Sequence, residues 1–160
     1  MSLRAAGRGT NMYGDTGVIR VLARRMRDQA DDLRREADRL VGEAEAVWWT
    51  GWAADAMRSR ARDRGAALRR TAALHDDAAS ALERHAAEID RLKELIAWLE
   101  RRAHSVVTAA RDRLADLGRR LLAGVHDLVP DPIDQLLDRF VPPPSGHRDW
   151  LTVELPGLGG

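Results

Sequence analysis

The residues of this 160-residue chain whose types could support chemistry are five scattered histidines and a few adjacent acidic residues. His85 and Glu88 stand three positions apart, so two possible metal ligands would lie on adjacent helical turns, but a zinc site needs three or four donors. Asp76 and Asp77 have no nucleophile and base at a productive spacing, and the sequence has neither a phosphate-binding glycine loop nor a cysteine. We therefore expect no catalytic residues, no metal ligands and no cofactor, and interpret these side chains as solvated helix faces.

The charge pattern favours exposed helix faces over a nucleic-acid site. Charged residues make up 32% of the chain, yet the net charge is only +1. A nucleic-acid footprint needs a one-sided cationic excess. The one local excess is the segment 58–70, which contains six arginines and the single acid Asp63. A DNA-binding protein of the nucleoid is therefore kept as a less favoured alternative, and nucleic acid is not the expected partner.

The densest cluster of aromatic residues is Trp48, Trp49 and Trp52, and it surrounds Gly51. Glycine adopts backbone angles that are costly for other residues, and tryptophan is large enough to cover the end of a helix pair. The segment therefore predicts the elbow of a helical hairpin. We expect the tryptophans to pack the end of that hairpin, with Trp48 in the core. The alternative is that one indole is exposed and contacts a partner.

Two long amphipathic patterns flank this elbow. Before it, apolar or small residues recur in steps of three and four, with an eleven-residue period that predicts one long helix with its N-cap at Asp15 or Thr16. This stripe comprises Val18, Leu22, Met26, Gln29, Leu33, Ala37, Leu40, Ala44 and Val47. After the elbow, an alanine-rich pattern runs without proline to residue 129, which predicts a closely packed seam. In an antiparallel arrangement, Leu40 should lie nearest Ala61, and Leu22 near residue 79.

The sequence predicts an all-α fold: an antiparallel helical hairpin of long amphipathic helices, an extra C-terminal helix and a flexible tail. The expected segments are a disordered leader (1–14), the hairpin (15–102), a third helix or a continuation of helix 2 (103–129), a short helix (130–141) and a Pro/Gly-rich tail (142–160). No apolar run approaches the roughly 20 residues of a membrane-spanning helix. The first residues also lack the apolar core of a Sec signal peptide.

Trp49-Thr50-Gly51 between two such helices, followed by the small residues Ala53, Ala54 and Ala56, resembles the Trp-x-Gly (WXG, ESAT-like) family of type VII secretion substrates from actinobacteria and other Gram-positive bacteria. The resemblance covers residues 15–100. It implies an antiparallel hairpin that pairs into a four-helix bundle and is exported folded. Its partners would be a second copy, or another hairpin protein in a heterodimer, together with the type VII machinery.

The chain departs from the family in its length and in its export signal. Residues 101–160 lie beyond the part that resembles the family. The family signal, Tyr-x-x-x-Asp/Glu after helix 2, is absent, because the only tyrosine is Tyr13 and Gly17 occupies the fourth position after it. Trp150 and Glu154 have the required spacing and are a candidate export signal. Otherwise the signal would belong to a partner.

These observations predict a non-enzymatic, WXG-like protein that is secreted by a type VII system or targets a larger effector to it. It would be cytoplasmic before export and leave the cell by a route other than Sec. The alternative from another class is a cytosolic coiled-coil scaffold with no role in secretion.

Overall fold

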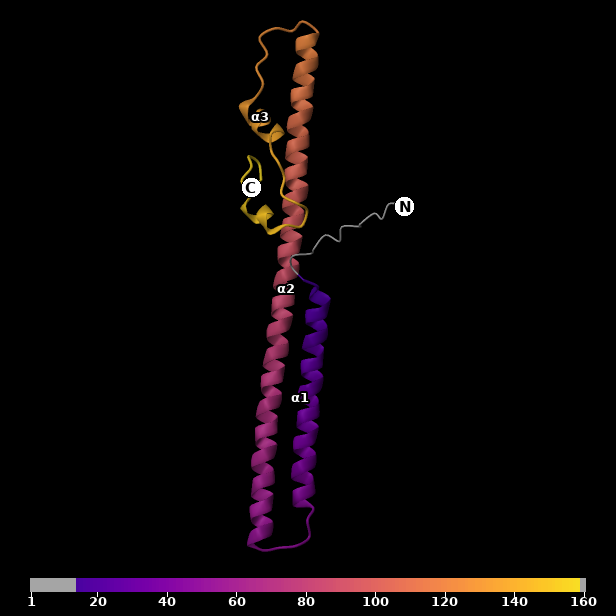
Figure 1. The fold of residues 1–160 in the computed structure, drawn as a ribbon, viewed down its shortest axis with the longest axis vertical. Coiled ribbons are helices and arrows are strands. Elements are labelled where there is room, and N and C mark those ends of the chain that lie inside the picture. The colour runs from indigo at the N-terminus through magenta and orange to yellow at the C-terminus, as the bar shows by residue number, and fades with distance from the viewer. Residues whose placement is uncertain (1–13, 159–160) are drawn as a thin grey trace, which may run out of the picture. The chain divides into compact units, whose positions relative to one another are not determined.

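The computed structural model describes residues 14–158, so most of the expected leader, including Tyr13, lies outside the described residues. Within this range the chain is all-helical, with α1 (Thr16–Glu45), α2 (Trp52–Leu122), α3 (Pro132–Asp138) and the short 3-10 helix η1 (Arg148–Thr152) (Figure 1). The chain forms two compact units that divide between Ile89 and Asp90, and α2 contributes to both. None of the helices in the described range is long and apolar enough to cross a membrane.

Helix α1 begins directly after one of the two expected N-cap residues. The side chain of Asp15 accepts a hydrogen bond of 2.8 Å from the backbone N–H of Gly17, so Asp15 is the N-cap. This bond satisfies one of the amides that a helix start leaves without a partner. At the other end, the N–H of Ala46 donates to the carbonyl of Gly42, and the helix stops there.

Helix α1 packs antiparallel to the first part of α2 (Figure 1), as the order of the ion pairs between them shows. The ion pairs that join the two helices include Arg27–Glu83, Arg34–Asp76, Asp38–Arg69 and Glu45–Arg62. As the residue number rises along α1, the residue number of its ion-pair partner in α2 falls. All these side chains are well exposed, so each pair contributes little to stability. Their value is that they define the register of the two helices.

That register corrects both expected pairings. Leu40 lies between Asp38 and Glu45, whose partners are Arg69 and Arg62, so it faces the part of α2 between these two arginines and not Ala61, although Leu40 and Ala61 line the same cavity. Leu22 precedes Arg27, whose partner is Glu83, so Leu22 lies beside residues after Glu83 and not near residue 79. The reason is the connection at residues 46–51, which is not helical and lets α2 begin beyond the end of α1 (Figure 1).

The buried line of α1 repeats every seven residues, not in the expected eleven-residue pattern. Val18 and Leu22 are 65% and 42% exposed, and Gln29 is also exposed. The buried positions are Thr16, Ala23, Ala30, Ala37 and Ala44. The prediction followed the largest apolar side chains, whereas closely packed helices bury the smallest ones at their contact line. A seven-residue repeat favours a left-handed supercoil.

The facing line of α2 is equally small. Its buried residues in this unit are Ala54, Ala61, Gly65, Ala72, Ala79, Ala86 and Ile89. Gly65 marks a close approach of the two helices, since a Cβ atom there would lie 2.8 Å from Cγ2 of Val41 and 3.5 Å from the carbonyl oxygen of Ala37. The expected alanine-rich seam is present, and a glycine inside the helix is explained by it.

The second unit is built on the continuation of α2, which runs to Leu122 without a break, so residues 103–122 form no separate third helix. Helix α3 follows, with Asp131 as its N-cap and Pro132 at its start, where a missing N–H has no cost. Leu137 is 2% exposed and packs on Val107 and Ala110 of α2. The short helix is therefore held by a small core of its own.

The C-terminal segment, expected to be a flexible tail, packs against α2 over residues 142–158. Trp150 is 5% exposed and forms a core cluster with Ile96, Ala103 and Leu158. Its indole Nε1–H donates to the carbonyl of Pro144 over 3.1 Å, and its ring meets Phe140 edge to face at 6.3 Å. The prediction weighted the proline and glycine content, but a buried indole with a satisfied N–H helps to anchor the segment.

Candidate functional site

Exposed tryptophans gather at the connection between α1 and α2. Trp48 and Trp52 are 91% and 85% exposed, and Trp49 is 39% exposed. The expectation that Trp48 is a core residue is therefore wrong. Helix α1 ends at Glu45, so Trp48 lies outside the helical stripe that would have carried it into the seam. Clustered exposed apolar side chains mark surfaces that bind other molecules.

Gly51 provides the turn that leads into α2. Its φ is +113°, a value that residues with a side chain rarely adopt, as expected for the elbow. Its carbonyl accepts a hydrogen bond of 3.1 Å from the N–H of Asp55, the first bond of the new helix. A Cβ atom at Gly51 would meet nothing within 4 Å, so the backbone angle alone selects glycine here.

Arg58 stabilises the connection between α1 and α2 by hydrogen bonds, a role that the sequence did not predict. Its Nη2 donates to the carbonyls of Val47 over 2.8 Å and Trp49 over 3.1 Å, and its Nη1 lies 3.3 Å from the carboxylate of Asp55. The sequence pattern places Arg58 in a solvated basic run. Its acceptors are backbone carbonyls, which carry no sequence signal. The only available clue was the position of an arginine one to two turns after the elbow.

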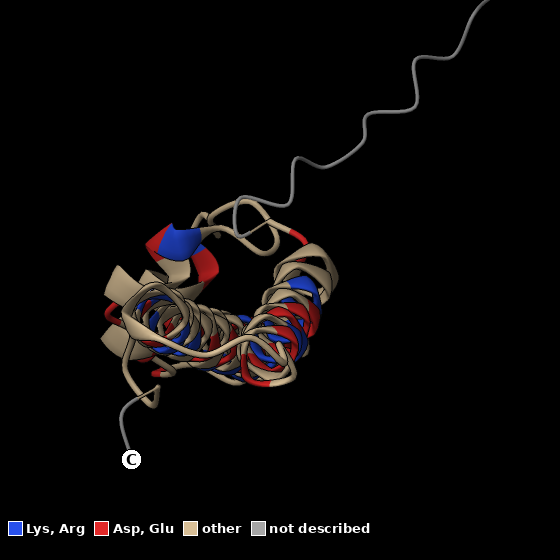
Figure 2. Cartoon of the chain, turned by 90° about the horizontal axis from the view of Figure 1, so that it is seen from below, with Lys and Arg blue, Asp and Glu red and all other residues tan. Residues whose placement is uncertain are grey.

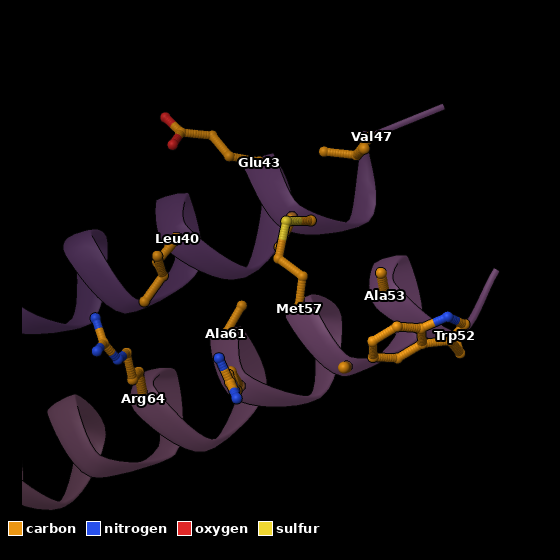
Figure 3. Close-up of a pocket in the computed structure, with 11 residues that line it drawn as sticks. Leu40, Glu43, Val47, Trp52, Ala53, Met57, Ala61 and Arg64 are labelled. Atoms are coloured by element: carbon orange, nitrogen blue, oxygen red, sulfur yellow. The ribbon is translucent and has the colours of Figure 1, made fainter. Parts of the chain in front are cut away.

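A cleft of about 690 Å³ lies between the last turns of α1 and the first turns of α2 (Figure 3). Met57 extends from α2 toward α1, and Trp52 lies at the start of α2. The apolar lining residues are Leu40, Ala44, Val47, Trp52, Ala53, Ala56, Met57 and Ala61. Glu43, Arg60 and Arg64 complete the lining. This combination can bind an apolar side chain of a partner, but it offers no nucleophile with a neighbouring base.

The basic segment 58–70 does not form a continuous cationic face. Arg58, Arg62 and Arg69 are paired with Asp55, Glu45 and Asp38. The helices carry basic and acidic residues together (Figure 2). This mixture is typical of solvated helix faces and gives the DNA-binding alternative no support.

The histidines and acidic residues considered as possible ligands do not line the cleft beside the connection. His75 is half-buried, with Nδ1 2.9 Å from the carbonyl of Thr71, whereas His85 and Glu88 are exposed. Among residues 14–158, no three His, Cys, Asp or Glu side chains are grouped so that they could hold a metal ion.

The candidate export signal is divided between the interior and the surface. Trp150 is a core residue of the second unit, whereas Glu154 is exposed beyond η1. The indole is therefore not displayed for recognition. The structure brings together Trp48, Trp49, Gly51 and Trp52 at the connection. Trp150, from the candidate export signal, packs in the core of the second unit instead.

Comparison with known proteins found no matching family model, curated protein or solved structure. The candidate site is defined by its geometry: a glycine turn, two exposed indoles and the adjoining apolar cleft, held in place by Arg58.

Proposed function

We propose that this protein is a non-enzymatic, WXG-like helical hairpin that is exported by a type VII secretion system, alone or as the targeting module of a larger effector. The observation that carries the proposal is the position of Trp49-Thr50-Gly51. This tripeptide lies in the connection between two long antiparallel helices, and Gly51 has a positive φ.

The pairing surface in this proposal is the row of larger side chains that borders the alanine seam. The seam covers Met26, Leu33, Leu40 and Val47 only in part, and Leu68 and Leu82 of α2 are also half-buried. Covering such a row with a second hairpin would remove the exposed apolar area from water at about 25 cal/mol per Å². A homodimer or a heterodimer with a related hairpin, arranged as a four-helix bundle, would meet this need.

In the same proposal, the exposed indoles of Trp48 and Trp52 contact the secretion machinery or an escort protein. Tryptophan is enriched among the residues that dominate binding energy at protein interfaces. The adjoining cleft is lined mainly by apolar side chains, together with Glu43, Arg60 and Arg64. The surface is thus suited to being bound by a partner, and Arg58 keeps the connection that carries it in one conformation.

The test is export from a host with a working type VII system. We expect wild-type protein in the medium, and its loss when the ATPase of that system is deleted. Trp48→Ala and Trp52→Ala should reduce export while the level inside the cell stays unchanged. Trp98→Ala is the matched control, because Trp98 is also exposed but lies in the second unit. Equal export in the strain that lacks the ATPase would refute the proposal.

Glu154→Gln tests the export signal separately. Glu154 is exposed, so the change leaves the core around Trp150 intact, which a truncation after Val141 would not. A loss of export in this variant alone would assign the signal to the C-terminal segment. Normal export would assign it to a partner or to another surface.

The seven-residue repeat of small residues in α1 and α2 favours a second candidate, a cytosolic coiled-coil scaffold. Such a scaffold would stay inside the cell whether or not the secretion ATPase is present. Light scattering on the purified chain, alone and mixed with a hairpin protein encoded by a neighbouring gene, would give the molar mass and therefore the number of chains in the assembly.

A further inference from the structure

The second unit contains a cleft of its own, of about 510 Å³, between α2 and the C-terminal segment. This size is within the range of pockets that take small molecules. Its apolar lining comes from both sides: Ala103 and Val107 of α2, and Phe140, Pro142, Pro143 and Trp150 of the C-terminal segment. The rings of Phe140 and Trp150 meet edge to face. The apolar part of the lining is therefore held in place by the core of the unit.

One wall of this cleft is a polar row on α2. Arg101, His104, Thr108 and Arg111 succeed one another at helical spacing and all line the cavity. Arg111 is engaged, since its Nε lies 3.0 Å from Oδ1 of Asp138 and its Nη2 donates to the carbonyl of the same residue. Within residues 14–158, the side chains of Arg101 and His104 have no ion pair or hydrogen bond. Two nitrogen-rich side chains, one turn apart, are thus free to bind a ligand in a cleft that is otherwise lined largely by apolar side chains.

The only acidic residue of the lining, Glu100, already accepts hydrogen bonds from the protein. The carboxylate of Glu100 accepts hydrogen bonds from the backbone N–H of Gly146 and from the hydroxyl of Ser145, the latter over 3.1 Å. It therefore serves to anchor the C-terminal segment to α2. Because Arg111 is paired with Asp138, Arg101 is the arginine of the lining that has no acidic partner within residues 14–158.

We propose that this cleft binds a small carboxylate with an apolar body. The body would lie on Val107, Phe140 and Trp150, and the carboxylate would accept hydrogen bonds from Arg101 and His104. The guanidinium group presents a planar fork that matches a carboxylate, and such charge-assisted hydrogen bonds are stronger than neutral ones. This site lies in the second compact unit and is independent of the proposed role in secretion.

The probe is 4-phenylbutyrate, titrated into the full chain labelled with ¹⁵N and observed through its five indole N–H signals. The Trp150 signal should shift and saturate, while those of Trp48 and Trp52 stay in place. The uncharged 4-phenyl-1-butanol should bind about tenfold more weakly, as expected when a charge-assisted pair is lost.

Arg101→Gln should also weaken binding of 4-phenylbutyrate about tenfold, because the fork that holds the carboxylate is removed. Arg91→Gln is the matched control: Arg91 is an exposed arginine of α2 in the same unit and lines none of the cavities described above, so affinity should not change. An unshifted Trp150 signal in the ligand-free variants shows that the unit remains folded. The proposal is overturned by a Trp150 signal that does not respond, by equal affinity for the acid and the alcohol, or by equal losses in the two arginine variants.

Discussion

Replacing Gly65 with alanine tests how closely α1 and α2 approach. Alanine is the better helix former by about 1 kcal/mol, so an unobstructed site would gain stability. At Gly65, however, the new Cβ would lie 2.8 Å from Cγ2 of Val41. Valine has one strongly preferred rotamer in a helix, so it cannot rotate away at low cost.

Overpacking of this kind costs about 1 to 3 kcal/mol, which offsets the gain and leaves a net change of about 0 to 2 kcal/mol toward destabilisation. The control is Gly42→Ala, in α1 of the same unit, where a Cβ atom would meet nothing within 4 Å. That variant should gain up to about 1 kcal/mol. The two substitutions should therefore differ by about 1 to 3 kcal/mol in the free energy of unfolding, measured by urea titration with circular dichroism.

Val41→Ala completes the test, because it removes the atom that the new Cβ would meet. In the background of Val41→Ala, the substitution Gly65→Ala should become stabilising, so a double-mutant cycle should give a coupling energy of about 1 to 3 kcal/mol. If Gly65→Ala stabilises the wild-type chain as much as Gly42→Ala does, the close approach is incorrect, and so is the explanation of this glycine.

Three further results are expected. Gly51→Val should lower the free energy of unfolding by about 1 to 3 kcal/mol in urea titrations, because a β-branched residue is strained at positive φ; an unchanged midpoint would argue against that turn. Trp52→Ala should change stability by less than about 0.5 kcal/mol, whereas Trp150→Ala should cost about 3 to 5 kcal/mol, and equal effects would contradict their assigned exposure. The hydrogen bond from Arg113 lowers the pKa of Asp134, so the folded chain binds fewer protons than the unfolded chain in acid. Stability is then fully present above the ordinary pKa of an aspartate and falls as pH drops through the lowered value. Urea midpoints between about pH 2 and pH 5 should show this decline in the wild type and a weaker one in Asp134→Asn.

The sequence determined the features that depend on neighbouring residues. The all-helical character, an N-cap at Asp15 or Thr16 and a glycine turn at Gly51 could be predicted, because capping and backbone angles are decided within a few residues, and the structure selects Asp15. The alanine content of α2 likewise indicated a close seam before any partner was known. Of the candidate site, the position of the elbow and the concentration of indoles there were predictable.

Only the tertiary structure decided which side chains are covered. The large apolar residues Val18 and Leu22 are exposed while alanines fill the contact, because two helices in close contact admit only small side chains between them. Trp48 was expected in the core and is exposed, whereas Trp150 was expected in a flexible tail and is buried. Burial depends on whether a segment that is distant in the sequence packs at that position. Arg58 contacts backbone carbonyls, whose positions follow from the path of the chain and not from its residue types.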